Sequence, residues 1–225
     1  WLKERIVNGD LGTIYHSEFD YLYGRLEKLT SGWRGEERSY SVTLGGAIHL
    51  VDLLLWLVQE TPVRVSAIGS PLGLKQDSLE HLGNFCGDVL RIALLEFGSG
   101  MTAKVSANFA NVSPHFHRVD VFGTGGTFMN LQVPKTLALE SGQNEWLDAD
   151  WETSALYFTS RNPRKFPETL SLPYPSVEKS VLLREFIESI LGDGEPSVSH
   201  REALDAVRVC LAIDQSVQEK LPISV

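Results

Sequence analysis

Residues 90–110, with the sequence LRIALLEFGSGMTAKVSANFA, decide the fold class of this chain. From residue 101 to residue 110, apolar and polar side chains alternate, which is typical of a strand with one buried face. Gly98-Ser99-Gly100 supplies a tight turn before this segment, so we expect residues 90–97 and 101–110 to form a hairpin. Strands joined by a hairpin are antiparallel, so this part of the sheet is predicted to be antiparallel.

More strands are expected on both sides of this hairpin. A second hairpin is predicted from residues 117–122 and 127–133, joined by a glycine-rich turn. Residues 13–23 place aromatic side chains at period two, and residues 63–68 alternate, so both segments are predicted strands. A short strand is also expected near residues 136–140.

Three segments of the chain lack a clear periodic pattern. Residues 24–44 are polar and irregular, and residues 142–175 are weakly patterned and rich in proline. Residues 69–87 are expected to form a long loop or lid.

Two helices are predicted from the spacing of apolar residues. The first covers residues 46–59, begins at Gly45-Gly46, and is apolar on nearly all sides, so we expect it to be deeply buried. The second covers residues 176–191 and is expected to face a core and to end at Gly192.

The last predicted helix covers residues 200–219 and starts with the capping box Ser199-His200-Arg201-Glu202. Its apolar stripe is predicted to consist of Ala203, Leu204, Val207, Cys210 and Leu211. A run of hairpin-linked strands followed by helices favours an α+β fold over a doubly wound α/β fold. With 225 residues, a single domain is expected.

Composition limits the partners of the chain. It carries 20 Lys+Arg against 29 Asp+Glu, and it has no basic cluster, which argues against binding to nucleic acid. No apolar run is long enough to span a membrane, and two cysteines cannot build a disulfide framework, so a cytoplasmic location is expected. Residues 1–7 resemble the last turns of a helix and show no signal peptide, so we expect a fragment of a longer protein.

The glycine-rich residues 123–127 invite comparison with a phosphate-binding loop. Such a loop leads into the N-terminus of a helix, whose backbone N–H groups bind phosphate, whereas a strand is predicted to follow here. G-x-G-x-x-G occurs nowhere in the chain. We therefore interpret these residues as a hairpin turn and expect no cofactor-binding residues in this chain.

His49 is the first candidate for a catalytic residue, because it lies in the first turn of a helix that is otherwise apolar. A neutral imidazole can accept a proton from a substrate hydroxyl. Asp52 lies three residues on, on a neighbouring face of the same helix. The alternative is a core histidine that hydrogen-bonds to the backbone, with Asp52 capping or pairing locally.

Further candidates for ligand contact come from three other segments. Trp33 and Arg34 lie in a polar segment and could bind an anion or a sugar hydroxyl, although a solvated loop arginine is the commoner case. His115 and His117 resemble half of a metal site, because alternate residues of a strand point to the same side. No further ligand motif is evident. A structural or rim role is the commoner case for these two histidines. We expect no metal, and we name His117 as a candidate substrate contact, together with Tyr21 on the aromatic first strand.

Three phrases of the chain share their order and spacing with a known family. They are RIVNGDLGTI at residues 5–14, GGAIHLVDLLLWL at 45–57 and VDVFGTGGT at 119–127. All three resemble parts of the C-terminal domain of the Gfo/Idh/MocA oxidoreductases. The first resembles the G-x-L/I-G-x-I segment that leads from a helix into the first strand. The second resembles the G-G…H-x-x-D-x-x-x-W-L helix, and the third resembles a glycine-rich hairpin that comes late in the domain. This family includes glucose-fructose oxidoreductase and inositol dehydrogenase, and the resemblance covers essentially all 225 residues.

The resemblance implies a fold for this chain and a second domain that binds the cofactor. It implies a large, mainly antiparallel sheet with helices packed on one face, while the open face commonly packs against another subunit. An N-terminal Rossmann domain that binds NAD or NADP, and a lysine in an E-K-P motif, would belong to a part absent from this chain. The substrate would lie between the two domains.

The resemblance also assigns residues. His49 falls on the family's catalytic histidine, Arg34 and Asp52 would orient hydroxyl groups, and Trp33 would lie near the substrate. The family often carries an aspartate four residues before the histidine, where this sequence has Gly45.

We therefore expect the substrate-binding and oligomerisation domain of an NAD(P)-dependent oxidoreductase acting on a sugar, polyol or cyclitol. The fragment alone is not expected to be active. Gly45 also supports an alternative, namely a sugar-binding, regulatory or dimerisation relative that has lost the chemistry.

Overall fold

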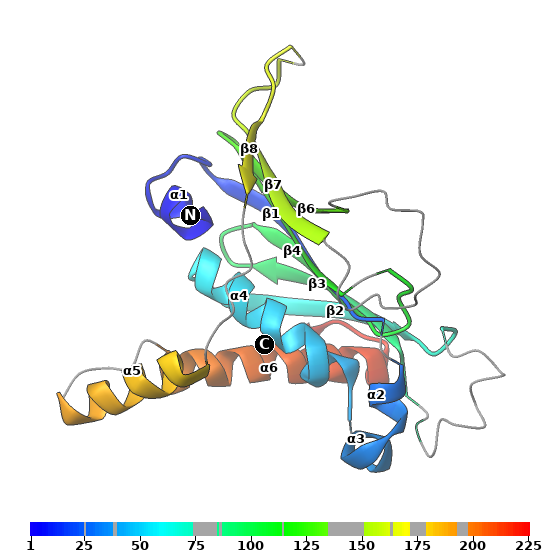
Figure 1. Ribbon diagram of the computed structural model, residues 1–225. Helices are drawn as coiled ribbons and strands as arrows, with labels where there is room; N and C mark the ends of the chain where they lie inside the picture. The colour runs from blue at the N-terminus through cyan, green and yellow to red at the C-terminus, as the bar shows by residue number, and fades with distance from the viewer. Residues whose placement is uncertain are drawn as a thin grey trace.

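The computed structural model shows one large β-sheet with helices α4 and α6 against one of its faces (Figure 1). It describes residues 1–24, 26–37, 40–73, 85, 87–113, 115–134, 151–162, 164–171, 179–192 and 198–225. The predicted α+β class, with a large and mainly antiparallel sheet, is confirmed.

The sheet contains nine strands within the described residues, in the order β8-β7-β6-β5-β1-β4-β3-β2-β9. The strands are β1 Ile14–Leu22, β2 Pro62–Ser70, β3 Leu90–Phe97, β4 Thr102–Asn108, β5 Phe116–Gly123, β6 Thr127–Pro134, β7 Trp151–Phe158, β8 Glu168–Ser171 and β9 Ile223–Ser224. The two predicted hairpins are present as β3–β4 and β5–β6. β1 lies between them, parallel to β4 and antiparallel to β5, and so joins both hairpins in one sheet.

The helices are α1 Leu2–Val7, α2 Glu27–Thr30, α3 Gly32–Glu36, α4 Ile48–Val58, α5 Lys179–Leu191 and α6 His200–Glu219. A π-helical turn, η1 Thr43–Ala47, leads directly into α4. α4 contacts β1, and α6 contacts both α4 and β2.

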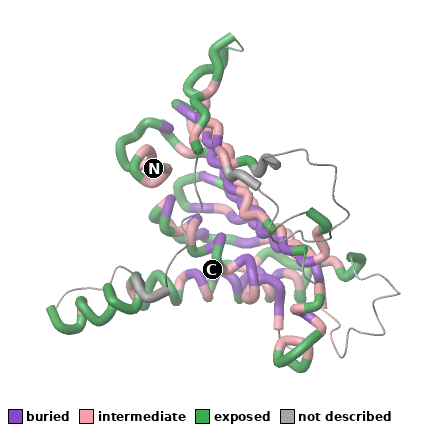
Figure 2. The backbone as a smooth tube through the Cα atoms, viewed as in Figure 1, coloured by how far each residue is buried: buried purple, intermediate pink, exposed green. Residues whose placement is uncertain are grey.

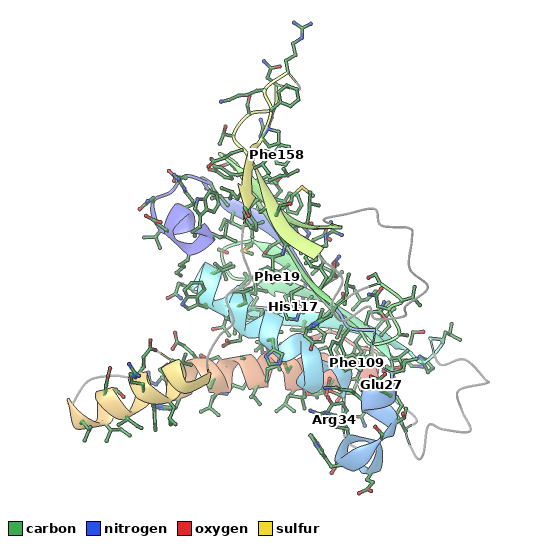
Figure 3. All side chains as sticks on the ribbon, in the orientation of Figure 1. Phe19, Glu27, Arg34, Phe109, His117 and Phe158 are labelled. Carbon is green, nitrogen blue, oxygen red and sulfur yellow. The ribbon has the colours of Figure 1, made fainter. Side chains whose placement is uncertain are left out.

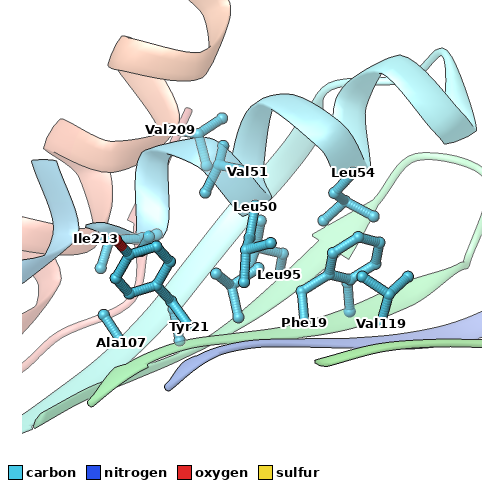
Figure 4. Packing of buried hydrophobic residues seen from close by; sticks show 14 of the residues in the cluster. Phe19, Tyr21, Leu50, Val51, Leu54, Leu95, Ala107, Val119, Val209 and Ile213 are labelled. Carbon is cyan, nitrogen blue, oxygen red and sulfur yellow. The ribbon is translucent and has the colours of Figure 1, made fainter. Parts of the chain in front are cut away.

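The core lies between the sheet and the helices α4 and α6 (Figures 2 and 4). Phe19 of β1 and Leu95 of β3 lie opposite Leu50 and Leu54 of α4, and all four side chains are buried. Val209 of α6 belongs to the same buried cluster. The alternation predicted for the strands therefore places their apolar side chains under these two helices.

The start of α4 approaches the sheet very closely at Gly46, which is buried in the π-helical turn. A Cβ atom at this position would lie 2.8 Å from ring carbons of both Tyr21 and Phe109. Carbon atoms do not pack at that distance, so any side chain here would push the helix away from β1 and β4. Gly46 thus fixes how near the first turn of α4 lies to the aromatic side chains of the sheet.

α4 is less buried than the sequence predicts. The prediction that it is deeply buried on nearly all sides is wrong. The helix buries one stripe, Leu50, Val51, Leu54 and Leu57. Trp56 is 48% exposed, and His49 and Asp52 are exposed as well. Since the sheet and α6 cover only part of its circumference, one side of the helix faces solvent.

α6 has the predicted bounds and the predicted capping box. The Ser199 hydroxyl accepts a hydrogen bond from the Glu202 backbone N–H at 3.2 Å, and the Glu202 carboxylate accepts one from the Ser199 N–H at 2.8 Å. Of the predicted stripe, Cys210 is buried, and the other buried residues of the helix are Ala206, Val209, Ala212, Ile213 and Ser216. Leu204 and Leu211 are exposed, because small alanine and serine side chains, which give little hydrophobic signal, fill the buried face.

α5 departs from the expectation that it faces a core. Its described side chains are largely exposed, including Phe186 at 52%, Ile190 at 61% and Leu191 at 81%. Figure 1 shows α5 extending away from the sheet. Its apolar face therefore lies outside the core formed by the described residues.

Several short elements escape the sequence patterns. The segment described as irregular, residues 24–44, contains α2 and α3, and the weakly patterned residues 142–175 contain β7 and β8. The predicted strand near 136–140, most of the loop at 69–87, and Cys86 lie outside the described residues. Among the helices that the structure describes, none combines the length and apolar character needed to cross a bilayer.

The face of the sheet opposite the helices carries a network of charged side chains. Lys104 of β4 lies 3.1 Å from Asp20 and 2.5 Å from Glu18, both on β1. On β5, Arg118 pairs with Asp120 at 2.6 Å. Alternation along the strands thus separates an apolar face under the helices from a polar face on the other side.

Replacing Phe19 by alanine is expected to lower the free energy of unfolding by about 3–5 kcal/mol, because it leaves a cavity beneath α4. Urea denaturation monitored by tryptophan fluorescence measures this loss. Tyr15→Ala on the same strand is the control, since Tyr15 is 52% exposed, and its loss should stay near about 0.5 kcal/mol. Equal losses in both variants would contradict the assigned core.

Candidate functional site

His49 lies on the exposed side of α4, two residues after the π-helical turn ends at Ala47. Its side chain lines a pocket of 560 Å³ between α4 and the beginning of α6. The sequence alternative of a buried core histidine is therefore wrong. The imidazole is open to a ligand from the solvent side while the helix that carries it is anchored in the core.

The pocket combines acidic side chains with one aromatic ring. α4 contributes Asp52 and Trp56 beside His49, and α6 contributes Glu202 and Asp205. In the free protein, Glu202 also holds the capping box of α6, and backbone and side-chain hydrogen bonds from Ser199 lower the pKa of the Glu202 carboxyl. The pocket therefore has a negative wall fixed to a helix end.

Asp52 is the nearest carboxyl to His49 along the helix, and its local environment changes its acidity. Partial removal of water by neighbouring side chains raises the pKa of Asp52, and the negative Glu202 raises it further, while His49 acts in the opposite direction. Asp52 is therefore a weaker acid than an isolated aspartate, and its carboxylate can accept hydrogen bonds.

A cluster of aromatic and histidine rings lies beside His49 on the sheet. Tyr21 of β1, which is 7% exposed, has its ring centroid 6.1 Å from that of His49 and 4.8 Å from that of His117. Phe109 stacks on Tyr21 at 5.8 Å. Tyr21 therefore connects two predicted site residues, His49 and His117, that lie 68 positions apart in the sequence (117 − 49).

The two histidines at the start of β5 are coupled. His115 Nε2 lies 2.9 Å from His117 Nε2, so one ring donates a hydrogen bond to the other. Burial lowers the pKa of His117 to about 4, and the neighbouring His115 and His49 act in the same direction. His117 is thus neutral at physiological pH and can donate or accept a hydrogen bond at the site.

Trp33 and Arg34 form a separate group with Tyr40. The Arg34 guanidinium lies 4.5 Å from the Trp33 ring centroid and 5.8 Å from that of Tyr40. The Trp33 and Tyr40 rings meet edge to face at 5.8 Å. In Figure 3, Arg34 lies on α3 and His117 on the sheet, so the predicted contacts fall into two groups rather than one.

The structure brings His49 and Asp52 together in the pocket and joins His49 to Tyr21 and His117 through ring contacts. Sequence reasoning missed Trp56 and Glu202 in the pocket, and it missed Tyr40. Trp56 lies seven residues after His49, so helical periodicity could have placed both on one face. Nothing in the sequence alone brings α6 to this helix.

The described residues offer no group of three or more histidine, cysteine, aspartate or glutamate side chains arranged to hold a metal ion. Cys210 is buried in α6, and burial raises the pKa of its thiol to about 12, so it is not a nucleophile. What the site can do is exchange a proton at His49 and hold hydroxyl groups with carboxylates and neutral rings.

Comparison with known proteins identifies a family whose profile matches this chain and solved structures with a similar fold. The family profile described as GFO/IDH/MocA C-terminal domain matches residues 1–129. No curated protein sequence gives a significant match.

Solved structures share the fold over nearly the whole chain. Aldose-aldose oxidoreductase from Caulobacter crescentus, complexed with glycerol, is 20% identical with a TM-score of 0.69, over 100% of this chain and 59% of that chain. Myo-inositol 2-dehydrogenase from Lactobacillus plantarum is 16% identical with a TM-score of 0.66, over 99% and 60%. The WlbA dehydrogenase from Bordetella pertussis, in complex with NADH and UDP-GlcNAcA, is 19% identical with a TM-score of 0.64, over 100% and 58%.

These identities establish a shared fold. The chain spans about 60% of the length of the solved chains that it matches.

The low pKa of His117 predicts how stability depends on pH. Because the unfolded histidine titrates near 6.5 and the folded one near 4, the unfolded chain binds a proton that the folded protein excludes. This contribution to the unfolding free energy is complete above pH 6.5 and is lost as the pH falls towards 4. Urea denaturation across this window should show a smaller decrease for His117→Gln than for the wild type.

His16→Gln serves as the control, because His16 lies on β1 and hydrogen-bonds to Thr102 at 2.9 Å. It should retain the wild-type decrease. Identical pH dependence in wild type and His117→Gln would contradict a neutral, half-buried His117.

Proposed function

The chain belongs to the Gfo/Idh/MocA family, as its resemblance predicted, and on that premise we propose that it is the substrate-binding domain of an NAD(P)-dependent oxidoreductase. The proposed substrate is a sugar, polyol or cyclitol that is oxidised at a secondary alcohol. Residues 1–225 would form one domain of a longer protein, and a separate domain would bind the nucleotide.

The observation that carries the proposal is the position of His49. It is exposed on a helix that is anchored in the core, it lines the 560 Å³ pocket, and it lies beside the rings of Tyr21 and His117. A general base needs access to the substrate and a fixed orientation, and this arrangement supplies both.

In the oxidation direction, the substrate O–H bond breaks and its proton passes to an imidazole nitrogen of His49. The C–H bond on the same carbon breaks, and the electron pair of the O–H bond forms the second bond of the carbonyl. NAD(P)+, when bound, supplies the acceptor for the departing hydride. Asp52, three residues along α4, would accept a hydrogen bond from a neighbouring hydroxyl.

The glycine-rich turn of this chain does not fit a nucleotide phosphate. The glycine-rich residues 123–127 connect β5 to β6, so the turn is followed by a strand rather than by a helix N-terminus. The cofactor would therefore be held by residues outside this domain, with its reactive ring brought to the exposed side of α4.

The composition of the pocket supports an uncharged, hydroxylated substrate. The carboxylates of Asp52, Glu202 and Asp205 can accept hydrogen bonds from hydroxyl groups, and the exposed face of Trp56 can pack against the C–H groups of a sugar ring. A phosphorylated or carboxylated substrate would meet like charge on this wall. The acidic lining thus favours a neutral sugar or polyol.

The remaining expectations belong to the same proposal. Tyr21 and His117 would border the substrate beside His49, and Arg34 with Trp33 would contact it from α3. The helix-free face of the sheet would pack against a second copy of the chain. A cytoplasmic location follows from the scarcity of cysteine, with two in the whole chain.

A second candidate function is a sugar-binding or regulatory protein that keeps the fold without the reaction. The observation that favours it is Gly45, which lies where the family often has an aspartate close to its histidine. Tight binding of a sugar without reduction of the cofactor would establish this second function.

The test of the proposed reaction is His49→Ala in the natural protein that contains this chain. Loss of a general base should lower kcat by about 100-fold or more, with a smaller change in KM. Steady-state reduction of nicotinamide, recorded at 340 nm with the preferred substrate, measures both.

His16→Gln is the matched control, because it removes an imidazole from the opposite face of the sheet and should leave kcat unchanged. If His49→Ala keeps kcat within about threefold of the wild type, far from the effect of a lost general base, the assigned role is wrong.

A further inference from the structure

Tyr40 occupies space that a side chain at position 45 would otherwise fill. A Cβ atom at Gly45 would lie 1.9 Å from the Tyr40 hydroxyl oxygen and 2.3 Å from ring atom Cζ. No side chain fits at position 45 while Tyr40 is in place. The glycine therefore allows the phenol hydroxyl to lie directly against the helical turn that precedes α4.

This position lies next to His49. Residues four apart on a helix are surface neighbours, with Cβ atoms about 5–6 Å from each other. Side chains on a helix also point back towards its N-terminus, which directs His49 towards the turn that contains Gly45. The pocket residues on α4, such as Asp52 and Trp56, follow His49 in the sequence. The Tyr40 hydroxyl thus lies against the helical turn that precedes His49.

Contacts with Trp33 and Arg34 hold the ring of Tyr40. The ring packs edge to face on Trp33 at 5.8 Å, and the Arg34 guanidinium lies 5.8 Å from its centroid. Within the part of the chain that the structure describes, no protein group hydrogen-bonds to the hydroxyl, and the residue is half-buried. A phenol hydroxyl can donate and accept a hydrogen bond, so one that lies against the turn preceding His49 is suited to bind a substrate hydroxyl group.

We infer that Tyr40 is a substrate-contacting residue, whose hydroxyl hydrogen-bonds to a substrate hydroxyl beside His49 and does the work of the side chain that Gly45 lacks. The inference rests on the proposed function for the class of ligand, and it adds to that function a residue from outside the helix. Besides their proposed contact with the substrate, Trp33 and Arg34 would then hold the Tyr40 ring in position.

The test uses Tyr40→Phe in the natural protein that contains this chain, with the sugar or polyol that the wild type oxidises. The substitution keeps the ring packing and removes only the hydroxyl, so kcat/KM should fall about tenfold, as for one lost hydrogen bond. Tyr15→Phe, at an exposed position on β1, is the control and should match the wild type.

Gly45→Ala provides an independent route to the same effect. The added methyl group must displace the Tyr40 hydroxyl without altering its chemistry, so kcat/KM should fall at least as far as in Tyr40→Phe. Because both changes remove one contact, the double variant should lose no more than Gly45→Ala alone. Losses that add in full, or a Tyr40→Phe protein within about twofold of the wild type, would overturn the inference.

Calorimetric titration with myo-inositol and with glucose, in the presence of NAD+, separates this inference from the proposed function. A wild type that binds either compound without turnover refutes the oxidoreductase proposal, and Tyr40 is then judged by whether Tyr40→Phe weakens Kd by the same factor. If the wild type oxidises the substrate and Tyr40→Phe leaves kcat/KM unchanged, the inference about Tyr40 is refuted and the proposed reaction stands. A wild type with neither binding nor turnover overturns both.

Discussion

The contact of Gly46 with the rings of Tyr21 and Phe109 is the constraint on which the site depends. Since a Cβ atom there would lie 2.8 Å from both rings, the first turn of α4 can approach β1 and β4 only with glycine at this position. That approach brings His49, three residues on, to 6.1 Å from the Tyr21 ring. A helix displaced by one side chain would separate the imidazole from the sheet that supports it.

The same packing divides α4 into two chemically different sides. Leu50 and Leu54 secure the helix over Phe19, while His49 and Asp52 remain open to the pocket. A residue that exchanges protons must be accessible and also held still, and these needs conflict on an isolated surface helix. Here the buried stripe supplies the rigidity, and the incomplete cover of the sheet and α6 supplies the access.

Two glycines in succession have different tasks in this arrangement. Gly46 lets the helix approach the sheet, and Gly45 lets the Tyr40 hydroxyl approach the helix. A sequence in which only one of them were glycine would keep one of these contacts. The proposed site therefore depends on the lack of a side chain at Gly45 and Gly46 as well as on the side chains that line it.

The sequence predicted the elements whose signals are local. Both hairpins, the bounds of α6 and its capping box at Ser199 follow from alternation and short-range hydrogen bonding, which involve few residues. Contacts between distant segments could not be predicted in the same way. The exposure of α4, the solvent-facing apolar side of α5 and the contact of Tyr40 with Gly45 depend on which elements pack together. His49, Asp52, Tyr21 and His117 were named from the sequence, but only the structure shows that they lie near one another.

Transfer of deuterium from substrate carbon to the nicotinamide ring would distinguish an oxidoreductase from a protein that only binds sugars. The natural protein that contains this chain would be incubated with NAD+ or NADP+ and a panel of sugars, polyols and inositols deuterated on carbon. We expect a reduced cofactor that carries deuterium on its nicotinamide ring, detected by mass spectrometry. A protein that binds a panel member and the cofactor but forms no deuterated, reduced cofactor would contradict this expectation.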